Sequence, residues 1–320
     1  MDNSRKLLSL CIPTYNRATI LRESLEHLVP IVEGLPVEIV VLDNASPDDT
    51  ADICAGYPSV RYIRNDENIG GDMNILKSYV TAANLTDYVC VIGDSYRLDD
   101  RSIRLMVERL STREYDMLIL SRGASGLGNN VQCYDNPDKL MAEIGGTMDL
   151  TGTIVISSRG VREEFYRDYL WSNFIHTSMA FGFLKSIDSP KVLFCGDIVL
   201  AHTMINKDST SWYGDAMRIF GKVWMTTIMS QSSYDVNARL ACIKAHDKYA
   251  SLFTPKRLIA LKERGFLDIK AVGRYVEYLP FVTDTPVSLV KVISVMPWRL
   301  SLLVYKMCRV PYHLKRILRR

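Results

Sequence analysis

The sequence predicts an α/β fold, in which a mixed, mostly parallel sheet is flanked by helices and followed by a helical C-terminal region. Two observations support this prediction. Short apolar runs alternate with helical patterns over the first 120 residues, which is the rhythm of βαβ units. The first two runs also end alike, in the polar segments that start at Pro13 and Asp43. Open α/β sheets bind ligands at the carboxyl ends of neighbouring strands, so these segments are expected to border a crevice.

Each element of this first part follows from its own residue pattern. Apolar runs predict strands at residues 7–12, 37–43, 59–64, 88–92 and 117–120. Helices are expected between them at residues 18–29, from about 48, at 72–83 and at 103–110; the third has apolar residues at helical spacing, namely Ile75, Leu76, Tyr79 and Val80. The run at 88–92 is almost continuously apolar, as in a strand buried on both faces. Pro13 ends the first strand because it lacks a backbone donor.

The pattern is looser after residue 120. Residues 121–136 are rich in Gly and Asn and are expected to form a loop. A strand is predicted at 152–156, a helix at 159–169 and another strand at 192–201. Residues 215 to about 279 are expected to be mainly helical.

The composition is that of a globular protein with an uneven charge distribution. The 320 residues are 48% hydrophobic and 23% charged, which excludes a disordered chain. No Asp or Glu follows residue 284, whereas eight bases do: Lys291, Arg299, Lys306, Arg309, Lys315, Arg316, Arg319 and Arg320. Residues 1–284 contain 31 basic and 36 acidic residues, a net charge of −5. An acidic body without a binding motif argues against a nucleic-acid partner.

The seven cysteines are far apart, and none forms a CxxC pair. Cys11 and Cys90 lie inside predicted core strands. We therefore expect reduced thiols in a cytoplasmic protein rather than a disulfide framework or a zinc site. No long apolar stretch precedes Pro13, so no secretory signal is expected.

Four segments carry a family resemblance: PTYNR, LDNASPDDT, NIGGDMN and the acid after the fourth strand. In this order and spacing, residues 7–120 resemble the family 2 glycosyltransferases, which have the Rossmann-like GT-A fold. Two later segments, FIH at 174–176 and TSW at 210–212, resemble bacterial O-antigen sugar transferases of the abequosyltransferase type. The resemblance implies an enzyme that uses a nucleotide-sugar donor.

The resemblance also implies where the donor would bind. The segment after the first strand would line the nucleotide pocket, with Pro13, Thr14, Tyr15 and Arg17. Asp43 would accept a hydrogen bond from the base or the ribose, or it is a plain turn or helix-cap residue. The loop and helix that follow the third strand would approach the phosphates or sugar hydroxyls through Asn68, Gly70, Gly71, Asn74 and Lys77.

Asp94 is the expected metal ligand and, with Ser95, part of the donor site. The family usually carries two or three carboxylates here, which hold Mg²⁺ or Mn²⁺ on the diphosphate. This chain has Gly93-Asp94-Ser95-Tyr96, so a single carboxylate remains. We expect Mg²⁺ or Mn²⁺ to be held by Asp94 and the diphosphate, with His202 as a late ligand.

The catalytic base must lie within hydrogen-bond reach of the acceptor hydroxyl. The candidates are Glu163, Glu164, Asp168, His176 and Asp197. We expect Asp168 to be the base and His176 to be a second active-site residue in the acceptor pocket, because the aromatic residues at 166–176 suit sugar stacking. A buried structural role stays open for His176. Another alternative stays open for Trp212, which either lines the acceptor side or anchors a helix.

The basic tail resembles an interfacial amphipathic segment. Residues 286–307 are apolar but are interrupted by Lys291, Pro297 and Arg299, so they do not form the ~20-residue span of a transmembrane helix. Apolar residues recur beside the bases: Val292, Val295, Trp298, Leu302 and Tyr305. Each base near an anionic leaflet contributes about 1 kcal/mol. The alternative is a helix packed on the body with a frayed basic end.

The predicted function is transfer of a sugar, with inversion, from a nucleotide-sugar donor to a lipid-linked saccharide acceptor. The setting is the synthesis of bacterial cell-surface polysaccharide, such as the O-antigen of lipopolysaccharide, at the cytoplasmic face of the membrane. We expect a donor-binding catalytic domain at 1–210, a helical extension at 211–284 and a membrane-surface tail at 285–320. A non-catalytic homologue that binds nucleotide sugar or scaffolds partner transferases is an alternative. A nucleotidyltransferase is a weaker one, because PTYNRAT is not a Gly-rich, basic loop.

Overall fold

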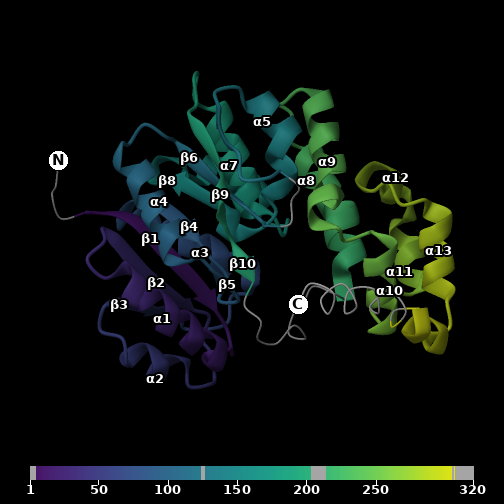
Figure 1. Cartoon of the computed structure of the whole chain (residues 1–320), viewed down its shortest axis with the longest axis horizontal. Coiled ribbons are helices and arrows are strands. Elements are labelled where there is room, and N and C mark those ends of the chain that lie inside the picture. The colour runs from purple at the N-terminus through teal and green to yellow at the C-terminus, as the bar shows by residue number, and fades with distance from the viewer. Residues whose placement is uncertain (1–4, 124–126, 203–213, 305, 307–320) are drawn as a thin grey trace, which may run out of the picture.

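An eight-stranded mixed sheet forms the centre of the N-terminal part of the molecule (Figure 1). The computed structural model describes residues 5–123, 127–202, 214–304 and 306. The strand order is β3-β2-β1-β4-β8-β6-β9-β7. The strands are β1 (Lys6–Thr14), β2 (Val37–Asp43), β3 (Val60–Arg64), β4 (Thr86–Val91), β6 (Met117–Ser121), β7 (Val131–Tyr134), β8 (Ile154–Ser157) and β9 (Val192–Val199).

Parallel pairing dominates the half of the sheet that starts the chain. β1 pairs in parallel with β2 and β4, and β2 pairs in parallel with β3. β8 is antiparallel to both β4 and β6, β9 is parallel to β6, and β7 is antiparallel to β9. The predicted mixed, mostly parallel sheet is confirmed.

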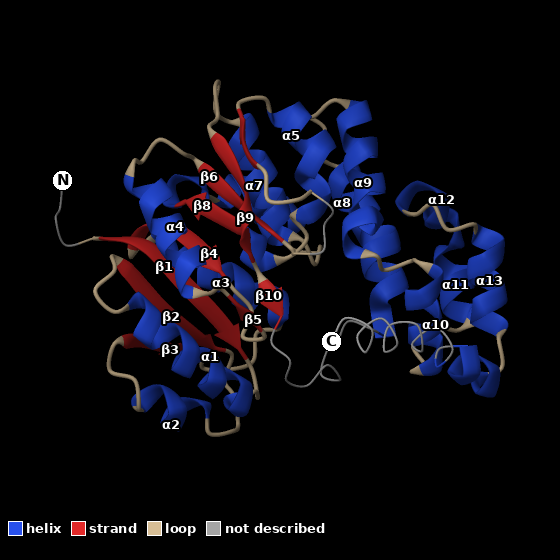
Figure 2. Ribbon diagram, in the orientation of Figure 1, coloured by secondary structure: helices blue, strands red, loops and turns tan. Residues whose placement is uncertain are grey.

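Side chains on the two faces of the sheet enter two separate hydrophobic cores, and Figure 2 shows helices packed around the strands. Leu10 and Ile12 join the core formed with α1 (Ala18–Val32), α2 (Thr50–Ala55) and α4 (Asp100–Ser111). Cys11, between them, joins the core formed with α3 (Gly71–Ala83), α5 (Pro137–Ile144) and α7 (Ile175–Lys185). Helices on both faces explain why the strands are apolar throughout.

The helical region after residue 213 packs against the second of these cores. It contains the π-helix η6 (Met217–Val223) and the helices α8 (Trp224–Met229), α9 (Val236–Ala250), α10 (Pro255–Glu263), α11 (Ile269–Tyr275), α12 (Leu279–Val282) and α13 (Val287–Val295). Trp224, Cys242 and Val290 belong to the same buried cluster as Val89 and Ile119 of the sheet. Figure 1 shows α10–α13 at the side of the molecule opposite β1–β3.

Most of the predicted elements are confirmed, but three predictions were wrong or incomplete and two helices were missed. The expected loop 121–136 contains β7, and the expected helix 159–169 is broken into α6 (Glu163–Tyr166) between two 3-10 turns. The strand predicted at 192–201 ends at Val199, and β10 (Ala201–His202) leaves the main sheet to pair with β5 (Tyr96–Arg97). Helices α5 and α7 were missed. For α5 the signal was present, since Asn136 caps the Lys139 amide and Pro137 follows it.

Candidate functional site

The carboxyl ends of β1, β2 and β4 meet at one edge of the sheet. Thr14 and Asp43 are register partners at the ends of β1 and β2. Cys11 pairs with Val91 at the end of β4, so Thr14 and Asp94 each lie three residues beyond a matched pair. The Thr14 hydroxyl donates to Asp94 Oδ2 at 3.3 Å. This register therefore brings together the polar segments that the sequence predicted as neighbours.

Asp43 is a fully buried carboxylate held by three donors. Its Oδ2 accepts hydrogen bonds from the Tyr62 hydroxyl and from Arg64 Nη1, both at 2.7 Å. Its Oδ1 accepts a hydrogen bond from the Ser46 backbone N–H at 2.8 Å, so Asp43 also has the turn role that the sequence left open. Burial and the bond to Asp43 raise the pKa of Tyr62 to about 12. A carboxylate offers about four acceptor positions, so these three donors leave one position of this buried group unfilled.

An asparagine network holds the loop before α3. Asn65 Nδ2 donates to Asn44 Oδ1 and to Asn74 Oδ1, each at 2.9 Å, and Asn44 Nδ2 donates to Asn68 Oδ1 at 2.8 Å. Lys77 Nζ donates to Asn65 at 2.8 Å. Sequence reasoning missed Asn44 and Asn65, although each directly follows a predicted strand. The amides thus shape the loop instead of pointing freely toward a ligand.

Gly70 and Gly71 sit where this loop enters α3. Gly70 has φ 85° and ψ 158°, a conformation that side chains with a Cβ rarely adopt. A Cβ on either glycine would meet no atom within 4 Å. The space beside both residues is therefore open, as close approach of a ligand to the backbone requires.

Asp94 is buried and forms an ion pair with Arg17. Arg17 Nη1 lies 2.6 Å from Asp94 Oδ1, and Arg17 Nη2 donates to the Ser95 hydroxyl at 3.1 Å. Ser95 Oγ in turn donates to Asp94 Oδ1 at 3.2 Å. Burial raises the pKa of Asp94, and Arg17 only partly offsets this effect. The structure joins Thr14, Arg17, Asp94 and Ser95 into one cluster.

Asp72 lies at the start of α3, beside the segment that precedes α7. It belongs to the first turn of α3 and is half-buried. Asn173 Nδ2 donates to Asp72 Oδ2 at 3.5 Å. Burial raises the pKa of Asp72, while the positive charge of Arg218 on η6 acts in the opposite direction. Sequence reasoning did not single out Asp72, because as an acid in a first helical turn it is typical of ordinary helices.

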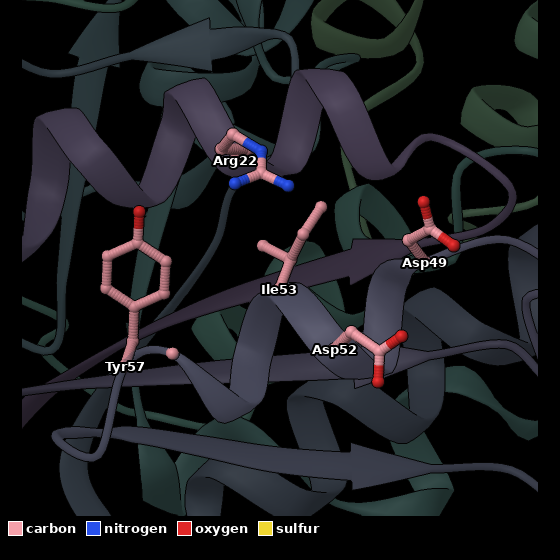
Figure 3. Close-up of a pocket in the computed structure, with 6 residues that line it drawn as sticks. Arg22, Asp49, Asp52, Ile53 and Tyr57 are labelled. Carbon is pink, nitrogen blue, oxygen red and sulfur yellow. The ribbon is translucent and has the colours of Figure 1, made fainter.

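Two cavities lie beside α1, and they differ in their relation to this edge. One of about 520 Å³ lies between α1 and α2 and is lined by Arg22, Asp49, Asp52, Ile53, Gly56 and Tyr57 (Figure 3). The other, of about 350 Å³, is lined by residues 16–20 together with Asp48 and Asp49, and so includes Arg17. Of the two, the second cavity is lined by a member of the Asp94 cluster, Arg17, and it therefore lies next to the candidate site.

Comparison with known proteins identifies the family of this chain. The model of "Glycosyl transferase family 2" matches residues 9–186, which contain Asp43, Asp94 and the asparagine network. The chain belongs to glycosyl transferase family 2. The abequosyltransferase RfbV of Salmonella typhimurium is 34% identical to this family 2 member over 131 residues, which are 38% of this chain and 37% of RfbV. The chain thus matches little more than a third of the length of this curated relative.

Solved structures show that this family 2 chain has the GT-A fold. S. aureus TarS 1-349 in complex with UDP-GlcNAc is 14% identical, with a TM-score of 0.55, and the match covers 94% of this chain and 92% of that one. S. aureus TarS 1-349 in complex with UDP is 12% identical, with a TM-score of 0.56, and the match covers 94% of this chain and 91% of that one. The fold predicted from the sequence motifs is confirmed.

The structure brings neither of the two predicted catalytic residues into contact with the Asp94 cluster. The Asp168 side chain is 84% exposed on a 3-10 turn, with Arg167 at 3.9 Å. His176 is 3% exposed, and its Nε2 lies 3.0 Å from the Asp149 carbonyl oxygen. Burial lowers the pKa of His176 to about 4. This geometry favours the structural role that the sequence left open for His176, and it gives Asp168 no contact with the Asp94 cluster.

The other base candidates are engaged in ion pairs. Glu163 and Glu164 are exposed and lie beside Arg167 and Arg162. Asp197 forms a two-pronged pair with Arg109, at 2.9 and 2.6 Å. Of the donor residues, Pro13 is half-buried in β1 and Tyr15 is 43% exposed. Trp212 lies outside the described residues.

The described residues do not fit the expected metal ion. They contain no group of three His, Cys, Asp or Glu side chains arranged to hold one. Asp94 is the carboxylate of the cluster, and a guanidinium already lies on its Oδ1. The backbone of His202 pairs with that of Tyr96, two residues beyond Asp94, but the His202 side chain is outside the described part of the chain. No chemical step is therefore assigned to a metal.

Proposed function

We propose that this chain is a glycosyltransferase that moves a sugar from a nucleotide-sugar donor to a saccharide acceptor. The observation that carries the proposal is the pair of buried carboxylates, Asp43 and Asp94, which follow β2 and β4, the two strands that flank β1, within the residues that match the family. This edge is where open α/β sheets bind ligands. RfbV is named as a sugar transferase and TarS was solved with UDP-GlcNAc, which supports a nucleotide-sugar donor.

The donor would lie along the carboxyl ends of β1, β2 and β4. Asp43, preorganised by Tyr62 and Arg64, would accept one hydrogen bond from the base or the ribose. Residues 13–15 would border the base. The open backbone at Gly70 and Gly71, at the start of a 13-residue helix, would face the phosphates or the sugar.

Asp72 is the carboxylate that we propose as the general base. Its pKa is raised by burial, which brings a carboxylate closer to the range in which it accepts a proton effectively. It would remove the proton of the acceptor hydroxyl as that oxygen attacks the anomeric carbon. The bond from this carbon to the diphosphate breaks, and its electron pair leaves with the diphosphate. Attack in line from the opposite side inverts the anomeric centre.

The acceptor is proposed to be a lipid-linked saccharide of the bacterial cell surface, reached at the cytoplasmic face of the membrane. No single helix among the described residues is long and apolar enough to cross a membrane, although the bent pair Val287–Val295 and Trp298–Val304 passes this test jointly. Val290 and Ile293 of α13 face the core, whereas Val292, Val295 and Trp298 are 57–60% exposed. Lys291 and Arg299 flank this apolar surface. An exposed apolar stripe with flanking bases suits attachment to an anionic membrane surface.

The test is to incubate the protein with UDP-, GDP-, CDP- and dTDP-sugars and a lipid-linked oligosaccharide extract, and to measure release of nucleoside diphosphate. Release that requires the acceptor supports the proposal. Nucleotide binding without release supports a second candidate, a non-catalytic donor-binding homologue, which the single carboxylate in Gly93-Asp94-Ser95-Tyr96 favours. Neither binding nor release would overturn both.

A further inference from the structure

We propose that Arg17, rather than a divalent cation, supplies the positive charge that neutralises the donor diphosphate. This inference deepens the proposed function and rests on it. Arg17 immediately precedes α1 and reaches across to the residues that follow β4. Its side chain is 29% exposed, while that of Asp94 is 4% exposed. The guanidinium is therefore anchored on a buried carboxylate and still accessible to a ligand.

The contacts around Asp94 occupy the carboxylate oxygens that a divalent cation would need as ligands. A magnesium ion needs oxygen ligands at about 2.0–2.1 Å in octahedral geometry, yet Arg17 Nη1 already lies 2.6 Å from Oδ1. Ser95 Oγ also contacts Oδ1, and Thr14 Oγ1 contacts Oδ2. A divalent ion on Oδ1 would thus compete with a like-charged guanidinium for the same oxygen. The other two members of the cluster are hydroxyls, which carry no charge to compensate.

The Arg17 side chain suits the diphosphate for a chemical reason. Guanidinium is planar, always charged, and presents several N–H groups that match phosphate oxygens. Asp94 and Ser95 orient Nη1 and Nη2, so less conformational entropy is lost when a phosphate binds. In this arrangement Asp94 acts as a positioning residue for Arg17. The same charge would stabilise the leaving diphosphate as negative charge develops on it.

The experiment measures binding of UDP, GDP, CDP and dTDP by calorimetry, once with EDTA and once with Mn²⁺. For wild type, we expect the tightest of the four to bind with a Kd that differs less than threefold between the two conditions. Arg17→Gln should raise this Kd at least tenfold in EDTA. Arg17→Lys should give a Kd between those of wild type and Arg17→Gln, because lysine keeps the positive charge but lacks the planar set of N–H groups. Arg22→Gln is the matched control, since Arg22 lies in the helix that Arg17 precedes but lines the other cavity, between α1 and α2.

Loss of Arg17 leaves Asp94 buried without its counter-ion, so a second variant guards against misfolding. Arg17→Gln combined with Asp94→Asn removes both charges and should keep the wild-type thermal midpoint while still binding nucleotide at least tenfold more weakly. Wild-type affinity in that double variant, or a wild-type Kd that weakens more than tenfold in EDTA, would overturn the inference alone. Absence of binding by all four nucleotides to the wild-type protein, with or without Mn²⁺, would overturn the proposed function and this inference with it.

Discussion

His246 Nε2 lies 3.1 Å from Asp149 Oδ2, and this contact joins helix α9 to the loop between α5 and β8. Both side chains are buried, with exposures of 0% and 2%. The same carboxylate also accepts a hydrogen bond from Arg122 at the end of β6. Burial acts to raise the pKa of Asp149, but Arg122 and His246 outweigh it, so the net shift is downward. The helical region is therefore attached to the sheet by a buried charge as well as by apolar packing.

Asp149→Asn is expected to destabilise the protein by about 3–5 kcal/mol, because it leaves the largely buried Arg122 without a counter-ion. Urea unfolding followed by circular dichroism measures this change. The matched control is Asp100→Asn, which breaks an exposed pair with Arg104 and is expected to change the free energy of unfolding far less, because solvent screens such pairs. Equal losses in the two variants would contradict a special role for the buried carboxylate.

His176 is expected to make stability depend on pH between about 7 and 4. Its pKa is about 4 in the folded protein and about 6.5 when unfolded. The unfolded chain binds the proton first, so stability falls as the pH drops through this window, by about 2 kcal/mol between pH 7.5 and 5. Asp149 affects stability in a different pH range. Its pKa is lowered in the folded protein, so it stabilises the fold above pH ~4, and this stabilisation is lost only below that pH.

Unfolding free energies of the wild type and His176→Gln at pH 7.5, 6.5, 5.5 and 5 test this expectation. The variant should show a flatter profile, by about 2 kcal/mol across the range. Profiles of identical slope would mean that His176 takes up its proton equally in both states.

Asp72→Asn is expected to lower kcat by at least about 10²-fold, because general bases contribute about 10²–10⁴-fold. Nucleotide binding should change less than threefold, since the amide keeps the shape of the side chain. Asp168→Asn provides the comparison, with its carboxylate 84% exposed and outside the cluster. The assay is nucleoside-diphosphate release in the presence of acceptor. If Asp168→Asn loses activity while Asp72→Asn keeps it, the base is the one that the sequence indicated.

Val292→Ser with Val295→Ser is expected to weaken membrane attachment about tenfold or more. These side chains are 57% and 60% exposed, and inserting each contributes about 1 kcal/mol. Co-sedimentation with vesicles of phosphatidylcholine and phosphatidylglycerol measures the effect. Val236→Ser with Leu240→Ser removes comparably exposed apolar residues of α9 and serves as the control. Equal sedimentation of both double variants would show that α13 is not the membrane-facing surface.

The sequence by itself determined the sheet that carries the site. Strand and helix periods are local, so runs such as 37–43 and 72–83 predicted β2 and α3 with little error. The polar residues after each strand also predicted the edge at which Thr14, Asp43 and Asp94 gather, because parallel strands end on the same side. The breaks within 121–136 and 159–169 were missed because weak local patterns there yield to tertiary packing.

Only the tertiary structure decided which polar groups pair. Arg17 meets Asp94 across 77 positions of the chain, and Asn173 meets Asp72 across 101. No local period encodes such contacts, since they depend on strand register and on how α7 packs beside α3. The same packing buried His176 and left Asp168 in solvent, although the two are neighbours in sequence. Periodicity places a residue on an element, whereas its charge partner and its burial are set by what the completed fold brings against it.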